Sequence, residues 1–235
     1  MNFKNLHILI VGAHALDGEI MAGALAARCV NEGGKATLLH ISNGECGHPR
    51  LFPEDYIKQK KIEAKKAASI LSAETYFWDI PDTKVENNYE NQMHLANDIR
   101  KLRPNIVITH WKGSWHPDHV STHFIVLRGI FLAALLSTDT KYPPHKVNDI
   151  LFSENWEDLD GFNSNISFDV SETFNVWKKA INSYELIRGN LSVFPYEDYY
   201  TSTMRRNGCL NGCKYAQSFI SLPEEVKIGL AQLIL

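Results

Sequence analysis

Two short segments of the sequence bring histidine and aspartate close together. The first reads Ala-His-Ala-Leu-Asp-Gly-Glu over residues 13–19, and the second reads His-Pro-Asp-His over residues 116–119. Zinc in proteins binds imidazole nitrogen and carboxylate oxygen, and a catalytic site uses three protein ligands with water at the fourth position. His14, Asp17 and His119 would supply such a set. We therefore select these three residues as candidate metal ligands.

Each segment also has a purely structural interpretation. Asp17 and Asp118 stand where helices are predicted to begin, and a carboxylate there can accept free backbone N–H groups as an N-cap. His14 could make a hydrogen bond at the end of a strand. Either segment alone favours this structural interpretation. Two such segments at matching ends of central strands favour a metal site instead.

Both segments follow predicted strands that are buried on both faces. Residues 6–11 and 105–109 are near-continuous apolar runs, and shorter strands are expected at 36–41 and 75–78. Helices alternate with these strands and are predicted at residues 17–31, 54–71, 91–102 and 118–136. This alternation indicates an α/β fold that is Rossmann-like, with a mostly parallel sheet and helices on both faces. In such sheets, ligands bind beyond the carboxyl ends of the strands.

The second half of the chain is less regular. Strands are expected at residues 149–153, 166–170 and 215–220, and helices at residues 173–187 and 223–234. Pro223 suits the first turn of the last helix. No repeat, low-complexity tract or linker interrupts the sequence, so we expect a single domain over residues 1–235.

The composition is that of an ordinary globular protein. Hydrophobic residues make up 44% of the 235 residues and charged residues 22%, which argues against disorder and coiled coil. The net charge of −3 gives no basic face for nucleic acid. No apolar run is long enough for a membrane span, and no signal peptide is evident. Four scattered cysteines then indicate a reducing cytoplasm, and Cys209 and Cys213 lack the second pair that structural zinc needs.

The sequence resembles the PIG-L/LmbE family of zinc-dependent N-deacetylases. Members carry an Ala-His-Pro-Asp-Asp-x-Glu segment after the first strand and a His-Pro-Asp-His segment after a later one. Residues 13–19 and 116–119 match these two segments. Supporting matches lie at residues 44–47, 63–64, 80–82, 103–104 and 215–219. The resemblance therefore extends over residues 6–220, nearly the whole chain.

The resemblance implies roles for the residues that match. The family's zinc ligands fall on His14, Asp17 and His119. Its oxyanion-stabilising histidine falls on His116, with Asp118 beside it to fix its orientation and charge. Zinc polarises an amide carbonyl and lowers the pKa of bound water, while a cationic imidazole faces the developing oxyanion.

One departure from the family concerns the general base. The first aspartate of the family's pair is replaced by Leu16, and the family's proline by Ala15. General-base catalysis contributes typically about 10²–10⁴-fold, so its loss could silence a hydrolase. Three explanations stay open: a different base, zinc hydroxide acting with little help, or binding without hydrolysis. His48, in the loop after the second strand, is the candidate base, although it could equally be an exposed loop histidine.

Other residues near these segments receive supporting roles. Glu19 supports the metal ligands, since family members with a full aspartate pair also carry it. His123 shares a helix face with His119 and is expected in a supporting or structural role. Trp111, Lys112 and Trp115 could shape a sugar-binding mouth, and Arg50 could bind an anionic group, although loop packing and solvated surface are alternatives.

We therefore predict a metal-dependent hydrolase of a linear amide C–N bond. The resemblance implies N-deacetylation of an N-acetyl amino sugar or its conjugate, with Zn²⁺ or another divalent metal. The alternative is a family member that keeps the metal but binds a ligand or catalyses another reaction. A dinucleotide-binding protein is disfavoured because the first turn lacks Gly-x-Gly-x-x-Gly. The apolar stretch 228–235 could pack on a neighbouring subunit, and we favour a homo-oligomer.

Overall fold

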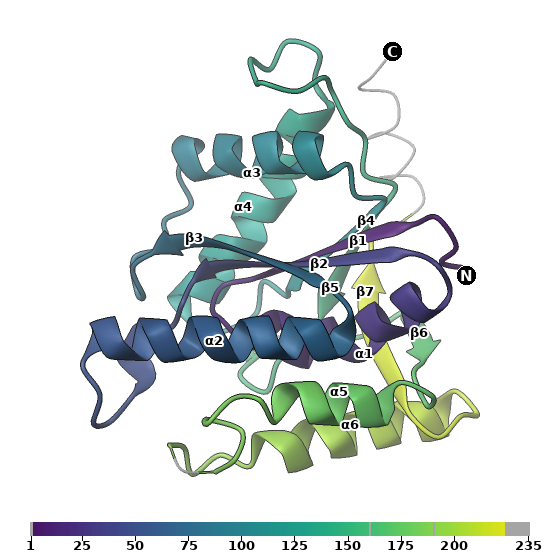
Figure 1. Cartoon of the computed structure of the whole chain (residues 1–235). Helices are drawn as coiled ribbons and strands as arrows, with labels where there is room; N and C mark the ends of the chain where they lie inside the picture. The colour runs from purple at the N-terminus through teal and green to yellow at the C-terminus, as the bar shows by residue number, and fades with distance from the viewer. Residues whose placement is uncertain (1, 160, 190, 224–235) are drawn as a thin grey trace.

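A computed structural model describes residues 2–159, 161–189 and 191–223. A single sheet lies between two layers of helices (Figure 1). The strands are β1 (His7–Gly12), β2 (Lys35–Ser42), β3 (Glu74–Ile80), β4 (Ile106–His110), β5 (Asp149–Ser153), β6 (Ile166–Asp169) and β7 (Ala216–Ser221). The helices are α1 (Asp17–Asn31), the 3-10 helix η1 (Glu45–Gly47), α2 (Pro53–Leu71), α3 (Tyr89–Leu102), α4 (Pro117–Ala134), α5 (Phe174–Ile181) and α6 (Tyr196–Leu210).

The strand order places β1 and β4 at the centre of the sheet. The order is β3-β2-β1-β4-β5-β7-β6, and β1 pairs in parallel with both β2 and β4. Among the described strands, β7 alone runs against the others. The chain moves outward from β1 to β3 and then returns to the other side of β1 as β4. A crossing of this kind is a topological switch point, where α/β proteins bind ligands.

Strand β1 shows why a continuous apolar run suits this position. Ile8 and Ile10 join the core cluster on one face of the sheet, and Leu9 and Val11 join the cluster on the other face. Successive side chains of a strand point to opposite faces, so a strand covered on both sides must be apolar at every position. Helices α1, α2, α5 and α6 cover the first face, and α3 and α4 cover the second (Figure 1).

The predicted fold class and most of the predicted elements are confirmed. Helix α1 has the predicted bounds, and the strands agree within two residues at each end. The helix predicted over 173–187 is too long, because α5 ends at Ile181 and a series of turns follows. The helix predicted over 223–234 lies outside the described residues, apart from Pro223.

Helix α6 was not predicted from the sequence. It contains tyrosine, threonine, asparagine and glycine, all of low helix propensity, and it buries only Tyr200, Met204, Asn207 and Gly208. Such a narrow buried face leaves little periodicity to detect. In the part of the chain that the structure describes, no helix is both long and apolar enough to cross a membrane.

Cys29 provides a test of the core around α1. Its thiol is buried against the backbone carbonyls of Leu6 and Lys35, and this burial raises its pKa to about 11. Because the thiolate is the reactive form, Cys29 should resist alkylation in the native protein at pH 8. Exposed Cys209 should react readily. Mass spectrometry after iodoacetamide treatment measures both, and alkylation of Cys29 as fast as Cys209 would contradict this packing. Denatured protein serves as the control in which both react.

Candidate metal centre

A tight turn after β1 places the first two candidate ligands. Gly12 ends the strand, and a Cβ atom there would lie 3.0 Å from the Cβ atom of Asp17, so a larger residue would displace the aspartate. The Asp17 carboxylate accepts a hydrogen bond of 2.7 Å from the backbone N–H of His14. Leu16 between them has φ 104°, a conformation that costs energy for a branched side chain. The turn thus holds His14 and Asp17 against each other at the start of α1.

The loop after β4 places the third candidate ligand. Strand β4 ends at His110, and α4 begins at Pro117 with His116 as its N-cap residue. His119 lies in the first turn of α4 and is almost fully buried. Because β1 and β4 are adjacent and parallel, the two loops meet at the same edge of the sheet. The sequence prediction that these segments converge is confirmed.

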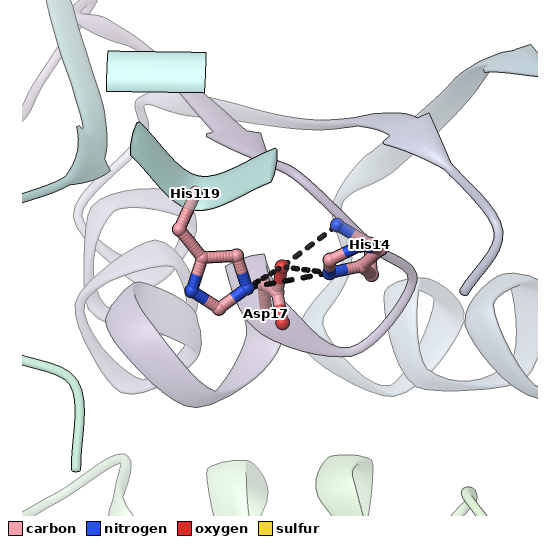
Figure 2. A group of neighbouring side chains, drawn as sticks. All are labelled: His14, Asp17 and His119. Carbon is pink, nitrogen blue, oxygen red and sulfur yellow. Dashed lines mark hydrogen bonds and ion pairs between the residues drawn. The ribbon is translucent and has the colours of Figure 1, made fainter. Parts of the chain in front are cut away.

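Three potential ligand atoms form a nearly equilateral triangle (Figure 2). His14 Nδ1 lies 3.3 Å from Asp17 Oδ2, His119 Nε2 lies 3.4 Å from the same oxygen, and the two nitrogens are 3.3 Å apart. A tetrahedral zinc ion with bonds of about 2.0–2.1 Å separates its ligand atoms by about 3.3–3.4 Å. The donor types and their spacing therefore fit one tetrahedral divalent ion with a fourth position left for water.

The surroundings of His14 favour a positive charge. Its Nε2 atom lies 3.1 Å from Asp82 Oδ1 and 3.1 Å from Asp118 Oδ2, so three carboxylates surround one imidazole. Burial alone would lower the pKa of His14, but Asp118, Asp17 and Asp82 together raise it well above its usual value. A metal cation at Nδ1 would satisfy the same excess of negative charge, while the carboxylates at Nε2 fix the orientation of the ring.

The other two ligands are already in the protonation state that a metal needs. Burial raises the pKa of Asp17, but His119, His110 and His14 more than offset this and hold it well below its usual value. Burial and the nearby His110 lower the pKa of His119 to about 3, so its imidazole is neutral. Metal ligation requires deprotonated side chains, and both residues meet that requirement near neutral pH.

Two loop segments that pair with each other place polar groups around Nδ1 of His119, the ring nitrogen that faces away from the triangle. Residues 113–115 hydrogen-bond with residues 157–159, and this pairing brings Ser114, Asn155 and Glu157 around Nδ1 of His119. Their distances to that nitrogen are 3.4, 3.1 and 3.2 Å. A carboxylate that contacts the second ring nitrogen of a ligating histidine fixes its tautomer and makes it a better ligand. Burial raises the pKa of Glu157 to about 7, with Asp17 contributing in the same direction.

Glu157 should therefore contribute to metal affinity without touching the metal. Glu157→Gln keeps the size of the side chain but removes its charge, and zinc affinity should fall about 10–100-fold. Competition with a chromophoric chelator measures this affinity. The matched control is Glu154→Gln, because Glu154 lies in the same loop and, within the described residues, has no recorded contact with His119. Equal affinities for the two variants would contradict the role of Glu157.

A second group of potential ligands overlaps the first. His14, His116 and Asp118 also offer ligand atoms within 4.8 Å of one another. However, the Asp118 oxygen that faces His14 also accepts a hydrogen bond of 2.8 Å from the backbone of Thr83. His116 Nδ1 accepts from the backbone N–H of Asp118 at 3.3 Å. The atoms of the triangle formed by His14, Asp17 and His119 lie 3.3–3.4 Å apart, which is the spacing that tetrahedral zinc needs, so the triangle is the better metal site.

His116 lies beside the triangle, but Asp118 does not support it as expected. The rings of His14 and His119 lie 4.8 and 4.7 Å from the His116 ring. The side chain of Asp118 pairs with His14 instead of His116, because helix α4 turns the two side chains apart. Burial and the charge of His14 lower the pKa of His116. The expectation of a cationic His116 oriented by Asp118 is therefore not supported: the pKa of the ring is lowered, and its Nδ1 is held by the helix backbone.

The structure does not place His48 and Arg50 at the site. His48 Nδ1 accepts hydrogen bonds from the backbone N–H groups of Arg50 and Leu51, and its Nε2 faces Glu185 at 3.9 Å. The loop folds on itself around this ring, which packs on Tyr56. Arg50 is exposed. Neither residue lines the cavity beside the triangle, so their assignment as base and anion-binding residue is not supported.

Trp111 and Lys112 likewise lie away from the site. Trp111 packs edge-on against His123, Phe152 and Phe162, and Lys112 lies over the Trp111 ring at 5.4 Å. The chain turns at Lys112 and Gly113, and Trp115 beyond this turn lines the cavity. Of the three residues expected to shape a sugar-binding mouth, Trp115 lines the cavity, whereas Trp111 and Lys112 do not.

Glu19 and His123, which were predicted to support the metal ligands, do not contact these ligands directly in the described part of the chain. Glu19 is fully buried, where it accepts a hydrogen bond of 2.6 Å from Tyr184 and faces His40 at 3.7 Å. Within the described part of the chain, no recorded contact joins it to the three ligands. His123 contacts the backbone carbonyl of His110 at 2.9 Å, and the His110 ring stacks on His119. His123 therefore acts on the site through His110.

Some residues of the site were missed from the sequence. His110 Nε2 accepts from the backbone N–H of Ala13 and lies 3.3 Å from Asp17, which links the two loops. Asp82 follows β3 and belongs to the family match at residues 80–82, which is the sequence signal that points to the site. Asn155 and Glu157 follow β5, the next strand beyond β4, and their position at a strand end was the available signal.

A cavity of about 340 Å³ opens beside the triangle, and we call it the metal-site cavity. Its lining combines the ligands and His116 with Asp82, Glu157 and Lys60. Much of its wall is aromatic, formed by Tyr56, Trp115, Trp156, Tyr196 and Tyr200. Such a mixture of apolar wall and few polar groups is typical of small-molecule sites.

The fold and the site define a Rossmann-like α/β protein with a candidate two-histidine, one-aspartate metal centre at the switch point of its sheet. The chain belongs to the PIG-L family. Residues 9–130 match this family, which is described as GlcNAc-PI de-N-acetylase. The matched region begins within β1 and includes β2 to β4 and both histidine loops.

Two curated relatives are similar in sequence to part of this chain. A 4-oxalmesaconate hydratase from Pseudomonas putida is 29% identical over 51% of this chain and 49% of its own length. A 1D-myo-inositol 2-acetamido-2-deoxy-alpha-D-glucopyranoside deacetylase from Geodermatophilus obscurus is 29% identical over 58% of this chain and 55% of its own length. The chain thus spans about half the length of the curated relatives it matches.

Solved structures confirm the fold. A conserved protein from Thermus thermophilus has a TM-score of 0.83 at 25% identity, over 93% of this chain and 95% of its own. The 4-carboxy-2-hydroxymuconate hydratase from Pseudomonas putida has a TM-score of 0.84 at 19% identity, with 93% and 96% coverage. An N,N'-diacetylchitobiose deacetylase from Pyrococcus horikoshii has a TM-score of 0.80 at 18% identity, with 92% and 84% coverage.

Proposed function

We propose that the protein is a metal-dependent amidohydrolase that removes the acetyl group from an N-acetyl amino sugar or its conjugate. The observation that carries this proposal is the triangle of His14, Asp17 and His119, whose spacing fits a zinc ion beside a substrate-sized cavity. Membership of the PIG-L family and the deacetylases among its relatives support the reaction and the substrate class.

In this proposal, one set of residues would bind the metal ion and another residue would stabilise the oxyanion. A divalent ion held by His14, Asp17 and His119 would polarise the amide carbonyl and lower the pKa of water. His116 uses Nδ1 to accept from the Asp118 backbone, so its proton lies on Nε2. That N–H group, on a ring that lines the metal-site cavity, would donate a hydrogen bond to the oxyanion of the tetrahedral intermediate.

Leu16 leaves the role of general base without the family's carboxylate. It is buried, lines the metal-site cavity and cannot accept a proton. Among the described residues of the cavity wall, the acidic side chains other than Asp17 are Asp82 and Glu157. Asp82 is paired with His14, and Glu157 with His119. We therefore expect native deacetylation to be slow compared with an enzyme that has a free base.

The same observation favours a second candidate function. A hydratase adds water across a carbon–carbon double bond and has no amine leaving group to protonate. One relative in sequence and one in structure are hydratases, and the substrate name of the second includes a carboxyl group. A cavity that keeps the metal ligands but has Leu16 at the base position suits such a reaction on a small unsaturated acid.

One experiment separates the two candidates. Zinc-loaded protein is assayed for acetate release from 1D-myo-inositol 2-acetamido-2-deoxy-alpha-D-glucopyranoside and N,N'-diacetylchitobiose, and for loss of the ultraviolet absorbance of 4-oxalmesaconate. We expect acetate release that a chelator abolishes and added zinc restores. Hydration without acetate release would replace the first candidate by the second. If the protein with a fully loaded metal site catalyses neither reaction, both candidates are rejected and a metal-binding role remains.

Three further expectations remain proposals. We propose that residues 1–235 form one domain, which the continuous sheet of the described residues supports. We propose a reducing cytoplasmic environment, supported by the free thiols of the four cysteines. Partners are expected to be the small-molecule substrate and further copies of the same chain.

A further inference from the structure

A buried lysine lines the metal-site cavity. Lys60 lies on α2 and is only 4% exposed. Its ammonium donates one hydrogen bond of 3.0 Å to the backbone carbonyl of Ala15. Two aromatic rings, those of Tyr56 and Tyr184, lie 5.4 and 5.5 Å from the nitrogen. This group therefore stands next to the turn that holds His14 and Asp17.

The charge of Lys60 has no partner in direct contact. Among the described residues, no carboxylate lies within 4.0 Å of its nitrogen. Buried lysines are almost always paired, because the loss of hydration must be offset. The nearest acidic groups act only at longer range: burial lowers the pKa of Lys60, and Asp17 and Glu63 oppose this. Within the same described ranges, two of its three N–H groups have no recorded acceptor.

Lys60 is the only lysine or arginine among the described residues that line the metal-site cavity. The carboxylates of Asp17 and Asp82 lie in the same wall and act on the Lys60 charge, but among the described residues neither is within 4.0 Å of its nitrogen. An anionic group that entered here would meet one desolvated ammonium, where a charged hydrogen bond is stronger than in water.

We propose that Lys60 binds an anionic group of the substrate, a carboxylate or a phosphate. The assignment rests on the proposed function in one respect, since it takes the metal-site cavity as the substrate site. Lys60 then determines specificity: it selects molecules that place a negative charge beside Leu16 while their reacting group lies at the three ligands. Neutral sugars would leave the ammonium buried and unpaired, so they bind less well.

The test compares three probes that share one ring. N-acetylglucosamine is neutral, N-acetylglucosamine 6-phosphate carries a phosphate, and N-acetylmuramic acid carries a carboxylate. Calorimetry on zinc-loaded protein should show tighter binding of at least one anionic probe than of the neutral one. Lys60→Met should weaken that probe about 10–100-fold, as expected for a lost hydrogen bond to a charged group, and leave the neutral probe unchanged. Which anion responds distinguishes phosphate from carboxylate.

Two further variants keep the result interpretable. Lys60→Arg keeps the charge and should retain part of the anion preference, and Lys65→Met removes an exposed lysine from the same helix and should change nothing. Thermal unfolding and zinc content show whether each variant is folded and loaded. The proposal is overturned if wild type and Lys60→Met bind every anionic probe equally, including no binding by either. Failure to release acetate with anion binding intact would reject the proposed function alone.

Discussion

Asp17→Ala should purify without metal, whereas the native protein should hold about one zinc ion per chain. Asp17 Oδ2 lies within 3.4 Å of the ring nitrogens of His14, His119 and His110, so its loss removes both a ligand and the negative charge at the centre of the site. The loss in affinity should exceed the factor of about 10–100 that an outer partner contributes. Elemental analysis of both proteins, purified together and offered zinc, measures it.

The control for this prediction is Asp17→Asn. Asparagine can still accept the hydrogen bond from the His14 backbone, so the turn before α1 is kept. It carries no charge and should still lose the metal. Zinc should raise the unfolding temperature of the native protein and of neither variant. If Asp17→Ala kept one zinc ion per chain, the triangle would not be the metal site, and the group of His14, His116 and Asp118 would be tested next.

The convergence of the candidate ligands could be predicted because parallel strands end at one edge of a sheet. Two apolar runs identified β1 and β4, and the helices between them required a parallel arrangement. From this, His14, Asp17 and His119 were placed together without knowledge of a single distance. Because the strands are parallel, the loops that follow them lie at the same edge of the sheet, whatever conformations these loops adopt.

Loop conformation is what the sequence could not provide. His48 follows β2 and had the right chemistry for a base, but its ring nitrogen is used by the backbone N–H groups of Arg50 and Leu51. Glu157 had no recognisable motif, and it reaches His119 only because residues 113–115 and 157–159 pair. Both outcomes depend on backbone hydrogen bonds inside loops, which neither apolar periodicity nor residue type predicts.

Leu16→Asp should raise the rate of acetate release by about 10²–10⁴-fold if the native protein lacks a general base. The Leu16 side chain lines the metal-site cavity together with His14 and Asp17, so a carboxylate there would be placed beside residues that would hold the metal. The backbone should accept the change, because aspartate tolerates positive φ better than leucine does, and φ is 104° at this position. Zinc content should stay near one ion per chain, since no proposed ligand is altered.

Leu16→Asn separates the base from the other consequences of the substitution. Asparagine has the same shape as aspartate and tolerates the same backbone conformation, but it is no proton acceptor near neutral pH. The rate for Leu16→Asp divided by the rate for Leu16→Asn therefore measures general-base catalysis alone. A ratio near one, with both variants folded and loaded, would mean that the native site already moves this proton by another group. Since the structure pairs Asp82 with His14 and Glu157 with His119, that result would require one of these pairs to open when substrate binds.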